Sequence, residues 1–427
     1  MALPFKKLIG PLRENEFVRH NVIFFMGSLF ISALNYLYYP ILGRLMSTTD
    51  FGETQTLVSL FLQATIFLSV VGNVAVNIVT NERNTALRNR IIYELEYSAM
   101  LITLTILAVM VAFIPQLKTF LQFDQVGPFF VLALALVVSV PGALRGAYLR
   151  GTLAFGQLSV AGILGSLTKI LFSTAFVLLG FRTLGAIGGL VAAQILALAY
   201  SAWQAHRLGL HKPPHLKLWR KPDLALIRPH LRYALLVLVV SLVSTTLFSF
   251  DIIAVKHYFP PAVAGRYAGI ATIARIIYFL TASIATVLLS SVKLESGAAA
   301  NRRLLARSGL LQAAIGGGTL LVFTLAPDLI TRLLIGARYV DVAYLLPKLS
   351  LALFILAFVN LLFNYDLALR RTSTALVSIL GAVAMGIFVA MHHASLGAVV
   401  DSLVWGSLII LGLRAADSAR RRLSRYN

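Results

Sequence analysis

Long apolar runs are the feature that most constrains what this chain can form. Twelve of them recur along its 427 residues, each about 17 residues or longer, which is the length that a helix needs to cross a bilayer. They cover residues 21–43, 54–79, 97–114, 126–144, 155–179, 183–204, 233–255, 267–292, 308–326, 349–369, 375–391 and 396–413. A membrane barrel would show short alternating segments instead. We therefore expect an all-α polytopic membrane protein with about 12 transmembrane helices.

The distribution of basic residues predicts the orientation. The formal net charge is +21, from 37 Lys and Arg against 16 Asp and Glu. Of these 37, 27 fall at the two termini and on the even-numbered connections, against 8 on the odd-numbered connections. Because basic residues favour the cytoplasmic side of a membrane, both termini are expected in the cytoplasm. This topology explains most of the charge, so no nucleic acid partner is expected.

The connections are short, and the longest lies at mid-chain. It covers residues 205–232, is basic and contains four prolines, which is typical of a linker. We expect an N-terminal six-helix lobe over 1–204, this cytoplasmic linker, and a C-terminal six-helix lobe over 233–427. The chain has no cysteine, no phosphate-binding loop motif and no histidine pair with the HExxH spacing, so neither a cofactor nor a metal is expected.

The two halves resemble each other at a constant offset of 213 residues. Phe51-Gly52 corresponds to Ala264-Gly265 at this offset. Polar residues inside the spans also correspond: Ser28 with Ser241, Ser32 with Thr245, Ser59 with Thr272, Asn73 with Thr286, and Asn77 with Ser290. Since six spans separate the copies, they are parallel repeats.

Polar side chains form stripes on the first two spans of each half. Their helical spacing places each set on one helix face. The residues are Ser28, Ser32, Asn35, Ser59, Gln63, Asn73, Asn77, Ser241, Thr245, Thr272, Thr286 and Ser290. Helix packing through small hydroxyls is one interpretation. Four symmetry-related stripes favour the other, a polar cavity shared by the two lobes.

Ionisable residues within the spans are candidates for function. Arg275 and Lys169 lie inside spans, and Arg44 lies at the end of the first. We expect these three to give the cavity a positive potential suited to a phosphate or pyrophosphate. Asp251 and Asp366 are candidates for an ion pair or for a coupling ion, and internal ion pairs remain the alternative for Arg275 and Lys169.

Several segments resemble the polysaccharide transporter family, the lipid-linked oligosaccharide flippases of the multidrug/oligosaccharidyl-lipid/polysaccharide exporter superfamily. The segments are Tyr39-Pro-Ile-Leu-Gly-Arg44-Leu-Met with Asp50-Phe51-Gly52; Asp251-Ile-Ile-Ala-Val with Ala264-Gly265-Arg-Tyr267; Ala326-Pro327-Asp-Leu-Ile with Gly336-Ala-Arg-Tyr339; and Gly146, Leu149-Arg150-Gly151, Phe155, Lys169 and Gly185-Ala186. Each motif is degenerate, but together they span nearly the whole chain. The C-terminal half matches less well, and the two extra helices of the fourteen-helix peptidoglycan-precursor flippases are absent.

The resemblance implies two six-helix lobes around a central cavity and alternating access. It implies transport of a polyprenyl-diphosphate-linked glycan from the cytoplasmic to the outer leaflet for cell-surface polysaccharide biosynthesis. We accordingly expect a monomer in a bacterial-type inner membrane, working with polysaccharide polymerase machinery. The alternatives are a cation-coupled multidrug exporter of the same superfamily and, in a different class, a membrane glycan polymerase or glycosyltransferase.

Overall fold

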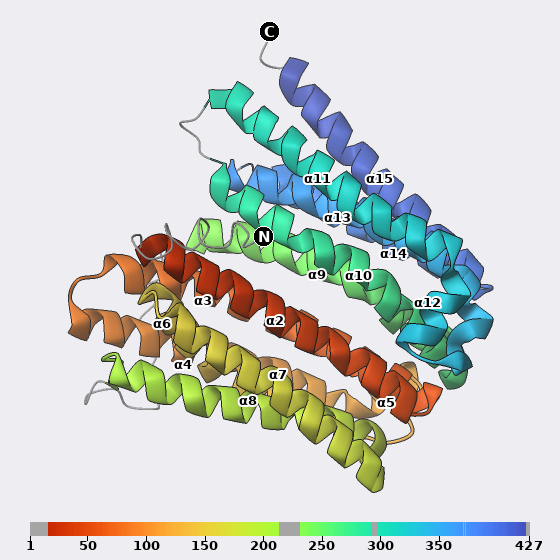
Figure 1. Ribbon diagram of the computed structural model, residues 1–427, viewed down its shortest axis with the longest axis horizontal. Coiled ribbons are helices and arrows are strands. Elements are labelled where there is room, and N and C mark those ends of the chain that lie inside the picture. The colour runs from red at the N-terminus through yellow and green to blue at the C-terminus, as the bar shows by residue number, and fades with distance from the viewer. Residues whose placement is uncertain (1–15, 213–230, 293–296, 370, 372, 424–427) are drawn as a thin grey trace, which may run out of the picture. The chain divides into compact units, whose positions relative to one another are not determined.

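The computed structural model describes the chain except for residues 1–15, 213–230, 293–296, 370, 372 and 424–427. Within the described part every regular element is helical (Figure 1). The helices of the first half are α2 (Glu16–Leu45), α3 (Thr48–Asn81), α4 (Thr85–Ala112), α5 (Ile114–Phe120), α6 (Gly127–Gly151), α7 (Phe155–Phe176), η1 (Val177–Phe181) and α8 (Arg182–Arg207). Those that follow are α9 (Leu231–Tyr258), α10 (Pro261–Ser291), α11 (Gly297–Leu325), α12 (Pro327–Leu334), η5 (Ala337–Leu345), α13 (Leu346–Ala368), α14 (Ser373–Met391) and α15 (Leu396–Leu423).

The expected all-α membrane architecture is confirmed. Ten helical segments of the described chain are long and apolar enough to cross a membrane. One of them, Phe155–Arg207, is 53 residues long and contains two expected spans. The backbone turns between these two at Gly180, whose φ of 90° favours glycine. The first expected span lies in α2. With the two spans of Phe155–Arg207 counted separately, each of the twelve apolar runs corresponds to a helix.

Several helices extend beyond their apolar runs. α4 begins at Thr85 rather than near residue 97, and the Asn84 side chain caps it by accepting hydrogen bonds from two backbone N–H groups. α11 begins at Gly297 rather than near 308. Polar residues continue a helix readily when water or headgroups solvate them, so hydropathy marks the membrane-crossing part and not the helix end. The short elements α5, α12 and η5 lie in connections that carried no helix prediction.

The described chain separates into two compact units, and neither is one continuous stretch of sequence. The first comprises Met1–Leu45, Phe67–Gln116 and Gln125–Leu231. The second comprises Met46–Ile66, Leu117–Asp124 and Arg232–Asn427. α3 therefore contributes to both units. The expected lobes 1–204 and 233–427 remain a prediction, and most of the expected linker lies outside the described residues.

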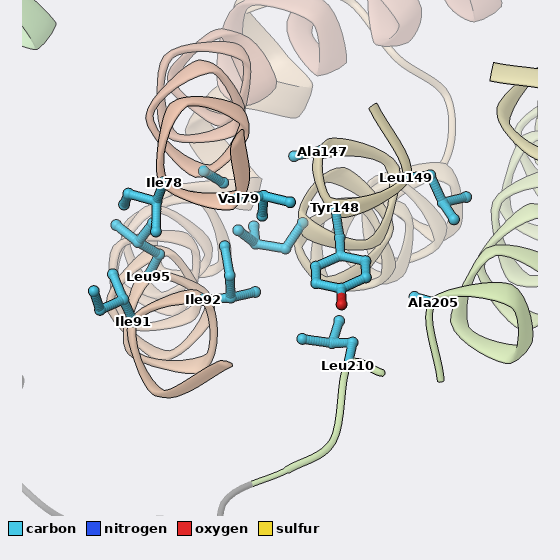
Figure 2. Packing of buried hydrophobic residues seen from close by; sticks show 12 residues of the cluster. Ile78, Val79, Ile91, Ile92, Leu95, Ala147, Tyr148, Leu149, Ala205 and Leu210 are labelled. Carbon is cyan, nitrogen blue, oxygen red and sulfur yellow. The ribbon is translucent and has the colours of Figure 1, made fainter. Parts of the chain in front are cut away.

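The first unit has its largest apolar core where α3, α4 and α6 meet the end of α8 (Figure 2). Tyr148 is fully buried there, and its hydroxyl donates a hydrogen bond to the Leu208 carbonyl. The same hydroxyl accepts from the Arg88 guanidinium, whose carbon lies 5.5 Å from the ring centroid. The buried ring thus ties three segments together without leaving its hydroxyl unsatisfied.

Small residues let helices of the first unit approach closely. A Cβ atom built on Gly27 of α2 would lie 2.7 Å from the Ser159 Cβ of α7. Gly189 of α8 likewise allows a close contact with α7, because a Cβ atom built on it would overlap Ser173. Close helix contact through small residues is the usual means of packing within a bilayer. Figure 1 shows α7 and α8 running alongside each other.

The second unit contains a contact between the two glycines that the repeat relates. A Cβ atom built on Gly52 of α3 would lie 2.7 Å from the Cα of Gly265 on α10. One built on Gly265 would overlap the Thr48 carbonyl. Beside this contact, Phe51 packs edge-on against Tyr339, with ring centroids 6.0 Å apart. The two copies of the repeated Gly therefore meet directly.

Candidate functional site

Lys169, on α7 of the first unit, is held by uncharged groups. Its ammonium donates a hydrogen bond to Oδ1 of Asn35 on α2. The Asn35 Nδ2 in turn donates to the Ser166 hydroxyl at 3.1 Å. The Lys169 Nζ also lies 4.5 Å from the centroid of the Tyr38 ring, a cation–π contact. Asn35 and Lys169, two residues predicted for the site, are thus brought together.

No carboxylate of the described residues lies within 4.0 Å of the Lys169 ammonium. An amide oxygen and an aromatic face lower the cost of a partly buried cation, but they leave its charge uncompensated. A cation inside a membrane helix usually has a carboxylate or a ligand to balance it. Lys169 is therefore the candidate among the predicted cations for direct contact with an anion.

Arg275 has a different environment. It lies on α10 of the second unit, and its Nη2 donates to Oδ1 of Asp251 on α9 at 2.6 Å. The guanidinium also donates twice to the Phe248 carbonyl. Both side chains of the pair are nearly buried, with exposed fractions of 7% and 5%. Tyr267 donates to the other Asp251 oxygen at 3.0 Å, so carboxylate and guanidinium are both engaged. The ion pair that the sequence left open as an alternative is the arrangement observed.

Asp366 also lies in an ion cluster. It is fully buried on α13, and Arg371 donates to its Oδ1 at 2.7 Å. Its Oδ2 accepts from the Thr374 hydroxyl of α14 and lies 2.5 Å from Nη2 of Arg414 on α15. This cluster ties together one end of three helices.

The three predicted cations are not gathered in one unit. Arg44 is exposed in the last turn of α2, in the same unit as Lys169, whereas Arg275 belongs to the second unit.

The members of the predicted polar stripes have varied surroundings. Gln63, like Asn35, makes a hydrogen bond between helices, since its Nε2 donates to the Ser249 hydroxyl. Thr272 donates to the Ala268 carbonyl of its own helix. Ser59 is buried; Ser28, Ser241 and Thr245 are half-buried; Ser32, Asn73 and Asn77 are exposed. The side chains of Thr286 and Ser290 lie outside the described part.

One buried cation was not singled out from the sequence. Lys256 is only 1% exposed at the end of α9. Its Nζ donates to the Gln122 carbonyl at 3.1 Å and lies 3.9 Å from the Glu53 carboxylate and 5.0 Å from the Phe123 ring centroid. The sequence places Lys256 directly after an apolar run, where a lysine is normally solvated. In the folded chain, Gln122, Phe123 and Glu53 all lie next to its ammonium.

No group of three or more potential metal-binding side chains occurs among the residues that the structure describes. Among the histidines that the structure describes, His206 and His211 approach to 3.2 Å between their Nδ1 atoms.

Comparison with known proteins relates this architecture to transporters. Residues 18–289, more than half of the chain, match the model of a family described as polysaccharide biosynthesis protein. Comparison with the curated proteins found no match.

Two solved structures share the fold over most of the chain. One is the inward-facing conformation of a multidrug resistance MATE family transporter of the MOP superfamily, with a TM-score of 0.74 and 14% identity over 91% of this chain and 95% of that one. The other is the lipid II flippase MurJ in an inward closed conformation, with a TM-score of 0.73 and 14% identity over 93% and 87%. An outward-facing MATE structure matches with a TM-score of 0.61 and 16% identity, over 95% of this chain and 96% of that one.

Proposed function

Because this chain belongs to the polysaccharide biosynthesis protein family and has the fold of MOP-superfamily transporters, we propose that it is a flippase for a polyprenyl-diphosphate-linked oligosaccharide. It carries this lipid from the cytoplasmic to the outer leaflet by alternating access, for cell-surface polysaccharide biosynthesis. It is a transporter and not an enzyme, and it acts as a monomer in a bacterial-type inner membrane with both termini in the cytoplasm. The polymerase that extends the glycan is its expected partner.

The observation that carries this proposal is the uncompensated charge of Lys169. A diphosphate group must leave the headgroup region during transport, and it needs a cation inside the membrane to balance it. Lys169 supports this role because its partners, Asn35 and Tyr38, are uncharged. A charge-assisted hydrogen bond from the ammonium to a phosphate oxygen would then form without breaking an ion pair.

Arg275 has a secondary part in this proposal. Its guanidinium already balances the charge of Asp251. Its proposed role is therefore to hold α10 next to α9 in the second unit. The remaining predicted polar residues, and Arg44, line the path along which the headgroup passes.

Binding of polyprenyl diphosphate to the purified protein tests the proposal. Removing one charge-assisted hydrogen bond costs about 1.5–3 kcal/mol, so Lys169→Gln should weaken binding about 10- to 100-fold. Lys348→Gln is the matched control, because Lys348 is 61% exposed and pairs with Asp401. Native mass spectrometry of the protein should detect a co-purifying diphosphate lipid that is lost in Lys169→Gln.

Two outcomes would contradict the proposal. Equal affinity of the wild type and Lys169→Gln would remove the argument from the charge. Failure of the wild type to bind polyprenyl diphosphate, together with binding of cationic drugs, would favour the alternative, a cation-coupled multidrug exporter, which the shared MATE fold permits.

A further inference from the structure

The short helix α12 (Pro327–Leu334) lies between two membrane-spanning segments of the second unit. It follows Ala299–Leu325 directly, and the next such segment begins at Ala337. Pro327 disfavours a helical residue before it, and Ala326 accordingly has a φ of −140°. The eight residues of α12 extend about 12 Å, too little to cross a hydrocarbon core of about 30 Å. α12 therefore lies where α11 ends (Figure 1), near the membrane surface.

The side chains of α12 divide among three sides of the helix. Thr331 is fully buried, on the side that packs on the rest of the unit. Asp328 and Arg332, one turn apart, are exposed on a second side. Leu329 and Leu333, also one turn apart, form the third side and are 56% and 58% exposed. The exposed surface of this helix is therefore charged along one side and apolar along the other.

This arrangement determines how α12 can lie against a bilayer. The charged side and the leucine side both run parallel to the helix axis. In an upright helix, Asp328 would lie at the depth of Leu329, and Arg332 at the depth of Leu333. Either the leucines would then be in water or the charges in hydrocarbon. With its axis along the boundary between acyl chains and headgroups, the helix gives both sides suitable surroundings.

The segments on either side of α12 also suit this boundary. Leu321, Val322 and Leu325 at the end of α11 are exposed. They end a segment apolar enough to cross a membrane, so lipid surrounds them. After α12, the Tyr344 side chain of η5 is exposed as well. Tyrosine is enriched at the level of the headgroups, where its ring and its hydroxyl are both solvated.

We infer that α12 is an interfacial helix whose partner is the surface of the phospholipid bilayer. Leu329 and Leu333 pack among the upper parts of the acyl chains, while Asp328 and Arg332 remain among headgroups and water. These two opposite charges cancel, so the leucines and not anionic lipids attach the helix. The predicted topology places this connection on the outer side, and the partner is therefore the outer leaflet. The inference is independent of the substrate that the protein carries.

Spin labels on single cysteines test this inference, because the chain has no cysteine of its own. The full-length variants Leu329→Cys, Leu333→Cys, Asp328→Cys and Arg332→Cys are labelled and placed in phospholipid vesicles. Collisions with O₂ report exposure to hydrocarbon, and collisions with a water-soluble nickel chelate report exposure to water. We expect the ratio of O₂ to nickel collisions to be about 5-fold higher at the two leucine positions than at the two charged positions. The difference should be the same with and without anionic phospholipid.

Two reference variants define the limits of the measurement. Leu310→Cys, at an exposed position on α11, should report hydrocarbon, and Ala394→Cys, in an exposed connection, should report water. If all four labels on α12 resemble either reference, α12 does not lie along the boundary and the inference is wrong. It is also wrong if the leucine positions are shielded from both reagents, since a second copy of the chain would then cover them. A difference that appears only with anionic phospholipid would mean that charge, and not the leucines, attaches α12.

Discussion

At the scale of single residues, two intramembrane cations that look alike in sequence have opposite environments. Lys169 donates to an amide and lies over an aromatic ring. Arg275 is engaged with a carboxylate and a backbone carbonyl. A residue type and its position in an apolar run predict the cost of burying the charge, but not which group balances it. That depends on which helix packs alongside.

The Arg275–Asp251 pair should therefore be important for stability. Arg275→Ala leaves a buried carboxylate with the Tyr267 hydroxyl as its remaining partner, which should cost about 3–5 kcal/mol. The midpoint of thermal unfolding in detergent should fall clearly. The double variant Arg275→Met with Asp251→Leu removes both charges and should recover most of the loss, since apolar replacement of a buried pair is often neutral. Unfolding midpoints equal to that of the wild type in all variants would mean that the pair contributes nothing.

At the scale of helices, hydropathy predicts much of the fold because the bilayer imposes one local requirement, a run of apolar residues. Each expected span corresponds to a helix for this reason. Outside the bilayer a helix does not need apolar residues. Hydropathy therefore did not predict the beginning of α11 or the short helices α5 and α12. The contacts of the candidate site residues carry no such local signal. The contact of Lys169 with Asn35 joins residues 134 apart in sequence, and only tertiary packing sets such a contact.

The glycine contact between α3 and α10 yields a prediction for these two helices. A methyl group on Gly265 would overlap the Thr48 carbonyl, so Gly265→Ala should force the beginnings of the two helices apart. Thr56 is fully buried one turn further along α3. Because the chain has no cysteine, a single Thr56→Cys can report the change. Its maleimide labelling should be slow by itself and several-fold faster with Gly265→Ala.

Gly317→Ala is the control for this experiment, because a Cβ atom built on Gly317 meets nothing within 4 Å. It should leave the labelling of Cys at position 56 unchanged. If Gly265→Ala also leaves the rate unchanged, the close approach of α3 and α10 is not what protects this part of α3.

At the scale of the whole molecule, the internal repeat relates the two halves of the sequence, but the intramembrane cations of the two units have different partners. The repeat matches polar positions of the two halves at an offset of 213 residues. Yet Lys169 of the first unit has uncharged partners, whereas Arg275 of the second unit is paired with Asp251. Matched positions in the repeat therefore do not predict matched environments for the intramembrane cations.

The membrane topology is a prediction for the chain as a whole. Basic residues lie mostly on alternate connections, so the connection containing Arg83 should face the cytoplasm and that containing Ala394 the outside. Both residues are exposed, and the chain supplies no competing thiol. In intact cells, a membrane-impermeant maleimide should label Ala394→Cys at once and Arg83→Cys only after permeabilisation. The reverse labelling pattern would mean that the protein has the opposite orientation in the membrane. A lipid headgroup would then first reach Lys169 from the opposite side.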